Sequence, residues 1–165
     1  MLVPEFYKGY IKYCQYDSIV KGLMLEGDAS LDFYKSLGPA LYEHRYAQGK
    51  WSIREILGHV IDGERVFAYR AMCMARGDKT PLPGFEQDDY IPNMNLGQRP
   101  MNSLITEFAT LRASSVDLFT GFSAQMLGNT GTASGYEFDV ESLGKIIVGH
   151  EIHHRKVIEE KYMNS

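Results

Sequence analysis

The stretch LGKIIVGHEIHHRKVIEEK, from Leu143 to Lys161, places two histidines inside an apolar pattern of helical period. At about 100° per residue one face of this helix is apolar, and His150 and His154 fall near its centre, about 40° apart. Buried imidazoles are costly unless their ring nitrogens are satisfied, and one metal ion satisfies two of them at this spacing. The stretch therefore predicts a core helix that carries either metal ligands or a hydrogen-bonded pair of core histidines. The apolar side chains of this face are Leu143, Ile146, Ile147, Val157 and Ile158.

Residues 150–154 also match the H-E-x-x-H pattern of zinc metalloproteases, in which the glutamate acts as a base. Such enzymes need a third ligand, supplied after a glycine turn or by a following helix. Only eleven residues follow His154, and they contain no histidine and no glycine. Glu159 and Glu160 lie more than a turn further along the same helix, and Glu151 falls at the edge of the apolar face. We therefore expect that the protein is not a protease and that the third ligand lies upstream.

His59 is the candidate for that third ligand. It lies in WSIREILGHVIDGERVFAYR (51–70), where Ile56 and Val66 mark a partly apolar helix face. Gly63, one turn after His59, leaves room beside the imidazole ring. The sequence thus predicts a site built from His59, His150 and His154, with one histidine on a different helix from the other two.

Two other side chains near this set, Asp62 and His153, have two interpretations each, and His44 has one. Asp62 is either an acceptor for a hydrogen bond from a ligand imidazole or an exposed acid on the helix flank. His153 either contributes to the site or, as we expect, packs at the edge of the core face. His44 lies among polar and aromatic residues of a loop, and we interpret it as a surface histidine.

The whole chain shows four long helical segments and few strand signals. Ser52 and Glu55 form a capping box at the start of the second segment, and Asp139 is placed to cap the last one. We expect the first segment to break near Gly27. The predicted class is all-α, a four-helix bundle in a single domain of residues 1–165. The expected helices are Pro4–Leu37, Ser52–Ala75, Met101–Met126 and Val140–Tyr162.

The connections between these helices differ in length and composition. Residues 78–100 contain four prolines, which exclude regular helix, and they exceed the usual length of a bundle turn. We expect this Pro-rich segment to cross the bundle and to cover one end of it. Residues 38–51 read as a loop, and the Gly-rich stretch 128–138 reads as a loop or a weak hairpin.

Composition excludes several functional classes. The 165 residues carry a net charge of -4 without a Lys/Arg cluster, which argues against nucleic acid and anionic membranes as partners. No apolar run approaches the roughly 20 residues of a membrane span, and no export signal is visible, so we expect a cytoplasmic protein. Cys14 and Cys73 lie far apart, each in a segment that reads as helical, and are interpreted as buried small apolar residues in a reducing compartment.

An ordered set of motifs resembles the DinB-like superfamily, including its YfiT-like branch of metal-dependent hydrolases. The motifs are KWSIREILGH (50–59), D-x-E-R (62–65), ARGDKTPLPGF (75–85) and GHExHH (149–154), and the resemblance runs from Tyr46 to Tyr162. It implies a four-helix bundle with one divalent metal ion, zinc or nickel. It carries the ligand role onto His59, His150 and His154, and it implies a homodimer.

The resemblance also implies a range of activities. Some relatives are transferases that use a low-molecular-weight thiol, such as bacillithiol or mycothiol, and we expect such a transferase here, with a small thiol and an electrophile as partners. The alternatives are a metal-dependent hydrolase and a non-catalytic metal-binding or stress-response protein. A general base beside the ligands would favour hydrolysis, a broad apolar cleft with a cationic rim would favour a thiol cosubstrate, and a fourth protein ligand would favour a structural role.

Further side chains are candidates for positioning a substrate. Arg65, Tyr69 and Arg155 lie near the expected ligands along the sequence, although surface ion pairs are the usual role of such arginines. Tyr46 and Trp51 precede the second helix, and we expect them to pack at its start rather than to stack on a ligand.

Overall fold

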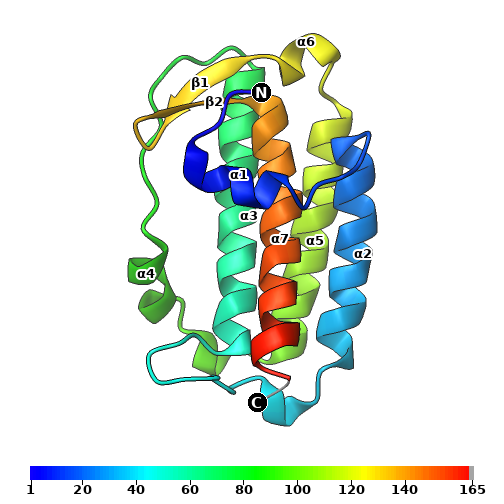
Figure 1. Ribbon diagram of the computed structural model, residues 1–165, viewed down its shortest axis with the longest axis vertical. Coiled ribbons are helices and arrows are strands. Elements are labelled where there is room, and N and C mark those ends of the chain that lie inside the picture. Colours follow the sequence, from blue (N-terminus) through cyan, green and yellow to red (C-terminus); the bar gives the residue numbers. More distant parts are fainter. Residues whose placement is uncertain (164–165) are drawn as a thin grey trace.

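Four long helices lie side by side in the computed structural model, which describes residues 1–163 (Figure 1). α3 packs against α7 and α5, and α2 packs against α5 and α7. The chain is therefore a four-helix bundle, as the sequence predicts. The four helices are α2 (Ile19–Ser36), α3 (Ile53–Ala75), α5 (Met101–Thr120) and α7 (Val140–Lys161).

The direction of the helices explains the long Pro-rich segment. α3 and α5 run the same way along the bundle, so residues 78–100 must return over its whole length, beside α3 (Figure 1). The segment is not free of helix, contrary to our expectation, since it forms three short turns, one of which contains Pro92. These turns are α4 (Gln87–Tyr90), η3 (Ile91–Asn93) and η4 (Leu96–Gln98).

Two helix starts follow from the predicted caps. The Ser52 hydroxyl accepts from the Glu55 amide at 3.2 Å, and the Ser52 amide donates to the Glu55 carboxylate at 2.7 Å. At the start of α7, Asp139 accepts from the amide of Ser142 at 2.7 Å. These bonds satisfy amides that have no partner inside the helix. They fix the first residues of the two helices that carry the histidines.

The first predicted helix, Pro4–Leu37, is wrong as a single element. A short turn, η1 (Glu5–Tyr7), and α1 (Lys8–Ile11) are separated from α2 by residues 12–18, whereas α2 continues through Gly27. A Cβ atom on Gly27 would lie 2.8 Å from Cγ of Arg112, so this glycine serves helix packing and not a break. The true break lets α1 cross α7 at Gly149, where a Cβ atom would stand 1.9 Å from the carbonyl oxygen of Tyr10.

The third predicted helix, Met101–Met126, is also too long. α5 ends at Thr120, and Ser123 caps a separate short helix, α6 (Ala124–Leu127), by accepting from the Met126 amide at 3.2 Å. The Gly-rich stretch after it is a hairpin, one of our two alternatives. Its strands β1 (Thr130–Ala133) and β2 (Tyr136–Asp139) pair antiparallel around a turn with positive φ at Ser134 and Gly135.

The core consists of two apolar clusters. Phe67, Phe138 and Leu143 belong to the first cluster, and Ile56, Leu57 and Phe108 belong to the second. Buried polar side chains of α3, α5 and α7 lie against both clusters, since Arg112 stands 5.0 Å over the ring of Phe108 and His150 lies 6.1 Å from that of Phe67. We call five of them the polar layer: His59, Glu64, Arg112, His150 and Glu151. The candidate site is one side of this layer.

Two other expectations concern the rest of the chain. Within residues 1–163, no helix is both long and apolar enough to cross a membrane. Cys14 and Cys73 are buried free thiols, as expected, but Cys14 follows α1 outside any helix. The remaining connection, residues 38–51, is a loop, as expected, and it contains one short turn, η2 (Pro39–Leu41).

Candidate metal centre

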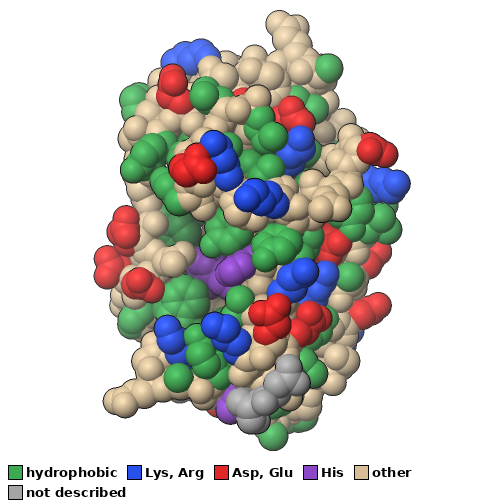
Figure 2. Space-filling model, viewed as in Figure 1, with side chains coloured by type: hydrophobic (Ala, Val, Ile, Leu, Met, Phe, Trp, Pro, Cys, Tyr) green, Lys and Arg blue, Asp and Glu red, His purple; other side chains and the backbone are tan. Residues whose placement is uncertain are grey.

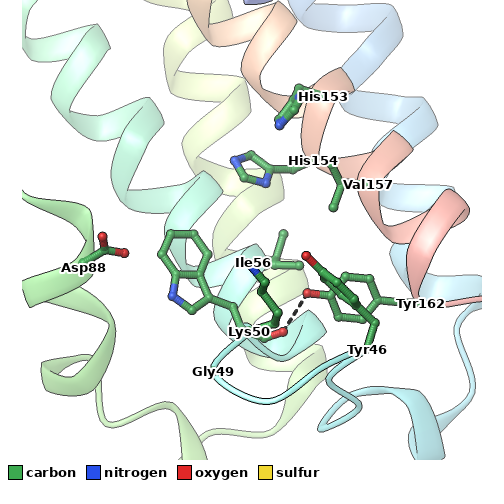
Figure 3. A pocket seen from close by; sticks show the side chains of 10 residues that line it. Tyr46, Gly49, Lys50, Ile56, Asp88, His153, His154, Val157 and Tyr162 are labelled. Carbon is green, nitrogen blue, oxygen red and sulfur yellow. Dashed lines mark hydrogen bonds between the residues drawn. The ribbon is translucent and has the colours of Figure 1, made fainter. Parts of the chain in front are cut away.

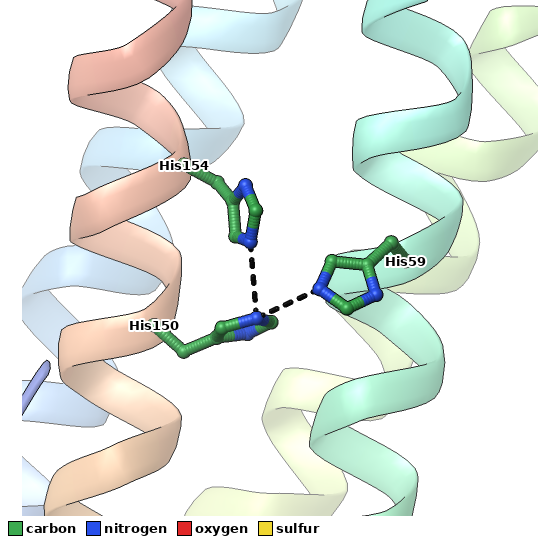
Figure 4. Close-up of side chains that lie close together, drawn as sticks. All are labelled: His59, His150 and His154. Carbon is green, nitrogen blue, oxygen red and sulfur yellow. Dashed lines mark hydrogen bonds between the residues drawn. The ribbon is translucent and has the colours of Figure 1, made fainter. Parts of the chain in front are cut away.

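Three histidines from two helices converge on one point between α3 and α7 (Figure 4). Nε2 of His150 lies 2.9 Å from Nε2 of His59 and 3.0 Å from Nε2 of His154. One nitrogen from each ring lies within 4.8 Å of the other two. The structure thus brings together the three residues that the sequence singled out.

Small and aromatic neighbours set the positions of these rings. Gly63 faces His150, since a Cβ atom there would stand 3.1 Å from Cε1 of His150. The ring of Tyr10 covers His150 edge-on at a centroid distance of 5.2 Å, and Trp51 lies 4.9 Å from His59. The glycine predicted to leave room for His59 therefore makes room for the histidine of the other helix.

Burial keeps all three imidazoles neutral. Burial, with a smaller contribution from the nearby His153, lowers the pKa of His59 to about 4. Burial lowers the pKa of His150 and of His154 well below the usual value, and neighbouring histidines add to the effect in both. Neutral imidazole is the form that binds metal ions. The cluster is therefore in its ligand form at neutral pH without any external help.

The residues present fit a divalent metal ion. Nitrogen ligands of tetrahedral zinc, each about 2 Å from the ion, lie about 3.3 Å apart, a few tenths of an ångström more than the two distances measured here. The third pair, between His59 and His154, lies within 4.8 Å. No other His, Cys, Asp or Glu within residues 1–163 joins this group. Three neutral ligands without a fourth leave a coordination position for water or substrate.

The other histidines and Asp62 do not belong to the cluster of three. His153 packs against Tyr10 at 5.2 Å between ring centroids, as expected for edge packing, but it also lies 5.1 Å from His154 and lines the adjoining pocket. His44 lies in the loop beside Tyr162, with ring centroids 5.9 Å apart. Asp62 pairs with Arg65 at 3.2 Å, and Nδ1 of His59 has no hydrogen-bond partner in the described chain. Of the two alternatives for Asp62, acceptance of a hydrogen bond from a ligand ring is therefore absent, because the carboxylate turns to Arg65 on the helix flank.

The glutamate of the H-E-x-x-H pattern lies on the far side of α7 from the cluster's open edge. Glu151 is 2% exposed and pairs with Arg112 of α5 at 2.5 Å. Arg112 also donates to Glu64 of α3, at 2.8 Å from Nη2 and 3.0 Å from Nε. Burial disfavours the charged form of Arg112, but Glu151 and Glu64 outweigh it and raise its pKa. Glu151 is thus held in the core by an arginine and does not face the histidines.

Sequence reasoning did not find this ion cluster, although a signal for it existed. Phe108, Arg112, Ser115 and Phe119 recur at helical spacing, so Arg112 stands in the apolar stripe of α5. A buried arginine in such a stripe needs a carboxylate partner. The same reasoning applied to Glu64 in α3 would have predicted an ion pair between Glu64 and Arg112.

A pocket of about 280 Å³ adjoins the open side of His154 (Figure 3). Histidine side chains reach the surface in the middle of the face that carries α1, next to hydrophobic side chains (Figure 2). The Tyr162 hydroxyl donates to the carbonyl of Trp51 at 2.7 Å and ties the pocket floor together. Tyr46 and Trp51 belong to the pocket wall, so both are available to a ligand. The lining residues are Tyr46, Gly49, Lys50, Trp51, Ile56, Asp88, His153, His154, Val157 and Tyr162.

None of the expected positioning residues reaches this pocket. Arg65 pairs with Glu107 at 2.5 Å as well as with Asp62. Arg155 pairs with Glu26 at 2.6 Å. Tyr69 is 52% exposed on the outer side of α3. The arginines thus have the surface ion pairs that we named as their alternative role.

Comparisons with known proteins agree with this architecture. The family model of the DinB superfamily matches residues 25–158. YfiT from Bacillus subtilis, described as "a probable metal-dependent hydrolase with an unusual four-helix bundle topology", superposes with a TM-score of 0.72 at 13% identity, over 99% of this chain and 90% of YfiT. YjoA, a DinB-like protein from Bacillus subtilis, superposes with a TM-score of 0.63 at 16% identity, over 88% of this chain and 90% of YjoA. No curated protein matches the sequence significantly. The chain belongs to the DinB superfamily.

Proposed function

We propose that this protein is a metal-dependent transferase that joins a low-molecular-weight thiol to an electrophilic carbon. The observation that carries the proposal is the cluster of three neutral imidazoles, incomplete as a coordination shell and open at His154 to a pocket of about 280 Å³. A divalent ion, zinc or nickel, held by His59, His150 and His154 supplies positive charge that lowers the pKa of a thiol or a water molecule.

The pocket wall suits a thiol cosubstrate with an apolar acceptor. Ile56, Val157 and Trp51 form apolar surface beside His154. The ammonium groups of Lys50 and Lys161 lie 6.0 and 5.5 Å from the ring centre of Tyr46, so the rim beside Tyr46 is cationic, while Asp88 adds one acid to the lining. Small cellular thiols carry carboxylates, which such a rim attracts. An apolar cleft with a cationic rim is the feature that distinguishes a thiol site from a hydrolytic one.

The reaction is a substitution at carbon. The thiol gives its proton to solvent, its sulfur forms a bond to the electrophilic carbon, and the leaving group departs with its electron pair. The chain's own contribution is to hold the acceptor between Trp51 and Tyr46 and to keep water from the cluster on its covered sides. Close placement of the two reactants accounts for part of the expected acceleration.

Hydrolysis is the second candidate, and Asp88 favours it. This acid of α4 lines the same pocket, on the side away from Val157 (Figure 3). A carboxylate in this position is placed to accept a proton from an attacking water. A purely structural metal site is less well supported, because it would require a fourth protein ligand.

The ligand assignment is tested by elemental analysis of purified protein. We expect one divalent metal ion per chain in the wild type and loss of most of it in His59→Ala, His150→Ala and His154→Ala. His44→Ala and His153→Ala are matched controls, because neither ring belongs to the cluster. Retention of metal by His59→Ala together with its loss in His153→Ala would refute the assignment.

The reaction is tested with metal-loaded and metal-free protein. A panel of cellular thiols is offered with a chlorinated dinitrobenzene, and conjugate is measured by absorbance. We expect metal-dependent conjugation with at least one thiol, little change in Asp88→Asn, and loss in His150→Ala. Ester or amide hydrolysis that disappears in Asp88→Asn, without any conjugation, would instead establish the hydrolase.

A further inference from the structure

A second pocket lies on the outer side of α3, under the Pro-rich segment that runs beside it. It has a volume of about 250 Å³ and shares no lining residue with the pocket at His154. Phe85 forms part of its wall and also stacks over His59, with ring centroids 6.4 Å apart. The second pocket is therefore a separate space that adjoins the metal centre through one aromatic ring. Its apolar and aromatic walls are Val66, Tyr69, Leu82, Pro83, Phe85 and Tyr90.

Arg70 supplies a buried positive charge to this apolar space. The residue lines the pocket and is 2% exposed. Its Nη2 atom donates to the carbonyl of Pro83 and to the hydroxyl of Ser134, each at 2.9 Å. The hydroxyl of Tyr7 is a third neutral partner. A guanidinium has five N–H donors, more than these three acceptors use.

No carboxylate within residues 1–163 pairs with Arg70. The chain buries two arginines, and the other, Arg112, lies between Glu64 and Glu151. Burial lowers the pKa of Arg70, and Tyr7 offsets only part of this effect. A buried charge without a counter-charge is strongly unfavourable. The ion pair that stabilises Arg112 inside the core is missing at Arg70, which instead faces a pocket.

The other cation of the pocket is already neutralised. Arg65 also lines the pocket and pairs with Asp62 and Glu107. An anion entering the pocket therefore meets one cation without a carboxylate partner, the buried Arg70, among largely apolar walls. A bidentate contact between carboxylate and guanidinium is the arrangement that satisfies Arg70 best.

We propose that this pocket binds a small carboxylic acid with an apolar body, its carboxylate on Arg70 and its body against Val66, Leu82 and Phe85. The volume lies just below the usual range of ligand pockets, which restricts the ligand to the size of a substituted benzoate or a short branched fatty acid. The site does not depend on the metal or on the reaction at His154.

Calorimetric titration of metal-free protein with 4-methylbenzoate tests the site, since removing the metal excludes binding of the carboxylate at the metal centre. Neutral 4-methylbenzamide has the same shape, and acetate has the charge without the apolar body. We expect saturable binding of the benzoate and at least tenfold weaker binding of both other compounds. Equal affinity for acid and amide, or no binding of the acid at about 10 mM, would overturn the proposal.

Variants separate the charge of Arg70 from its structural contacts. Arg70→Gln is expected to weaken the binding of benzoate at least tenfold. Its control, Arg76→Gln, replaces an exposed arginine outside the pocket and is expected to change the binding less than threefold. Gly84→Leu keeps Arg70 and adds a bulky side chain to the pocket lining, and it has room, since the nearest atom to an added Cβ is the Ser134 hydroxyl at 3.9 Å. If Arg70→Gln fails to fold, benzoate binding by Gly84→Leu still tests the site. Undiminished benzoate binding in folded Gly84→Leu protein would place the ligand elsewhere and refute the site.

Discussion

Gly63 of α3 lies in contact with the ring of His150 of α7, and a Cβ atom at position 63 would stand 3.1 Å from Cε1 and 3.4 Å from Nδ1 of that ring. The glycine is unfavourable for the helix by about 1 kcal/mol relative to alanine. Its absence of a side chain lets the imidazole of one helix rest against the backbone of the other. The helix thus gives up intrinsic stability at the one place where the cluster needs space.

Gly63→Ala separates these two effects. We expect a free energy of unfolding equal to or above that of the wild type, since alanine favours helix. We expect the affinity for metal to fall roughly tenfold, because the His150 ring must shift to make room for the added methyl group. Changes to residues that orient a metal ligand have effects of about this size. Competition with a chromophoric chelator measures the affinity. Gly9→Ala is the control, since nothing lies within 4 Å of an added Cβ there. Unchanged metal affinity in Gly63→Ala would contradict the role assigned to the glycine.

The metal-free protein is expected to lose stability as the pH falls from about 6.5 towards 5. Burial lowers the pKa of His59 from the ordinary 6.5 to about 4 in the folded chain, so the unfolded state binds more protons in this window. His59 alone then destabilises the fold by about 2 kcal/mol at pH 5. His150 and His154 add to this in the same direction.

Chemical denaturation at several pH values measures this loss. The pH dependence between 6.5 and 5 should become shallower in His59→Ala. Glu26, Glu55 and Glu107, whose pKa values lie below the ordinary 4.5, stabilise the fold at higher pH and lose that effect in more acidic solution. Burial raises the pKa of Asp62 and of Glu151, which acts in the opposite direction, so a loss of stability between pH 6.5 and 5 belongs to the histidines. An equally steep dependence in all three histidine variants would show that other groups are responsible.

Arg112→Met is expected to destabilise the protein more than any change of its two partners. Without the guanidinium, Glu64 and Glu151 are left as buried carboxylates with no counter-charge, and breaking a buried pair in this way costs about 3–5 kcal/mol. Glu151→Gln leaves one Arg–Glu pair and an amide that still accepts, so its effect on the free energy of unfolding should be smaller. Urea denaturation of the two variants compares them. A larger loss in Glu151→Gln than in Arg112→Met would contradict this ranking.

Glu151→Gln also bears on the metalloprotease pattern. Because Glu151 faces Arg112, we expect the variant to retain its metal and the wild type to show no hydrolysis of casein. Metal content and release of soluble peptide are measured on the same preparations. Hydrolysis by the wild type that vanishes in the variant would restore Glu151 as a catalytic base.

Local signals predicted the long helices well and failed where tertiary contacts decide. The caps at Ser52 and Asp139 are properties of a few adjacent residues, and both starts were predicted correctly. The break before α2 depends on α1 crossing α7 at Gly149, which no pattern within residues 4–37 reveals. We predicted the break at Gly27 because glycine disfavours helix. In the structure this glycine instead leaves space for the side chain of Arg112.

The candidate site was predictable to the extent that it depends on helix faces. The apolar stripes of the helices α3 and α7 were enough to predict that His59, His150 and His154 lie together, whatever the path of the loops. Trp51 and Phe85, which cover His59, lie in connections whose path depends on the whole fold, and their place was not foreseen. The metal, the thiol and the homodimer stay predictions, and light scattering at micromolar concentration tests the last.

The covered sides of the cluster have a kinetic consequence for any ion it holds. Tyr10 closes the side of His150 and Trp51 closes that of His59, so release into solvent runs through the pocket at His154. The residence time of the ion then depends on how fast it can pass through that pocket, as well as on its affinity for the three nitrogens. An occupant of the pocket would trap the ion, and transfer to a chelator would slow while equilibrium affinity stayed the same.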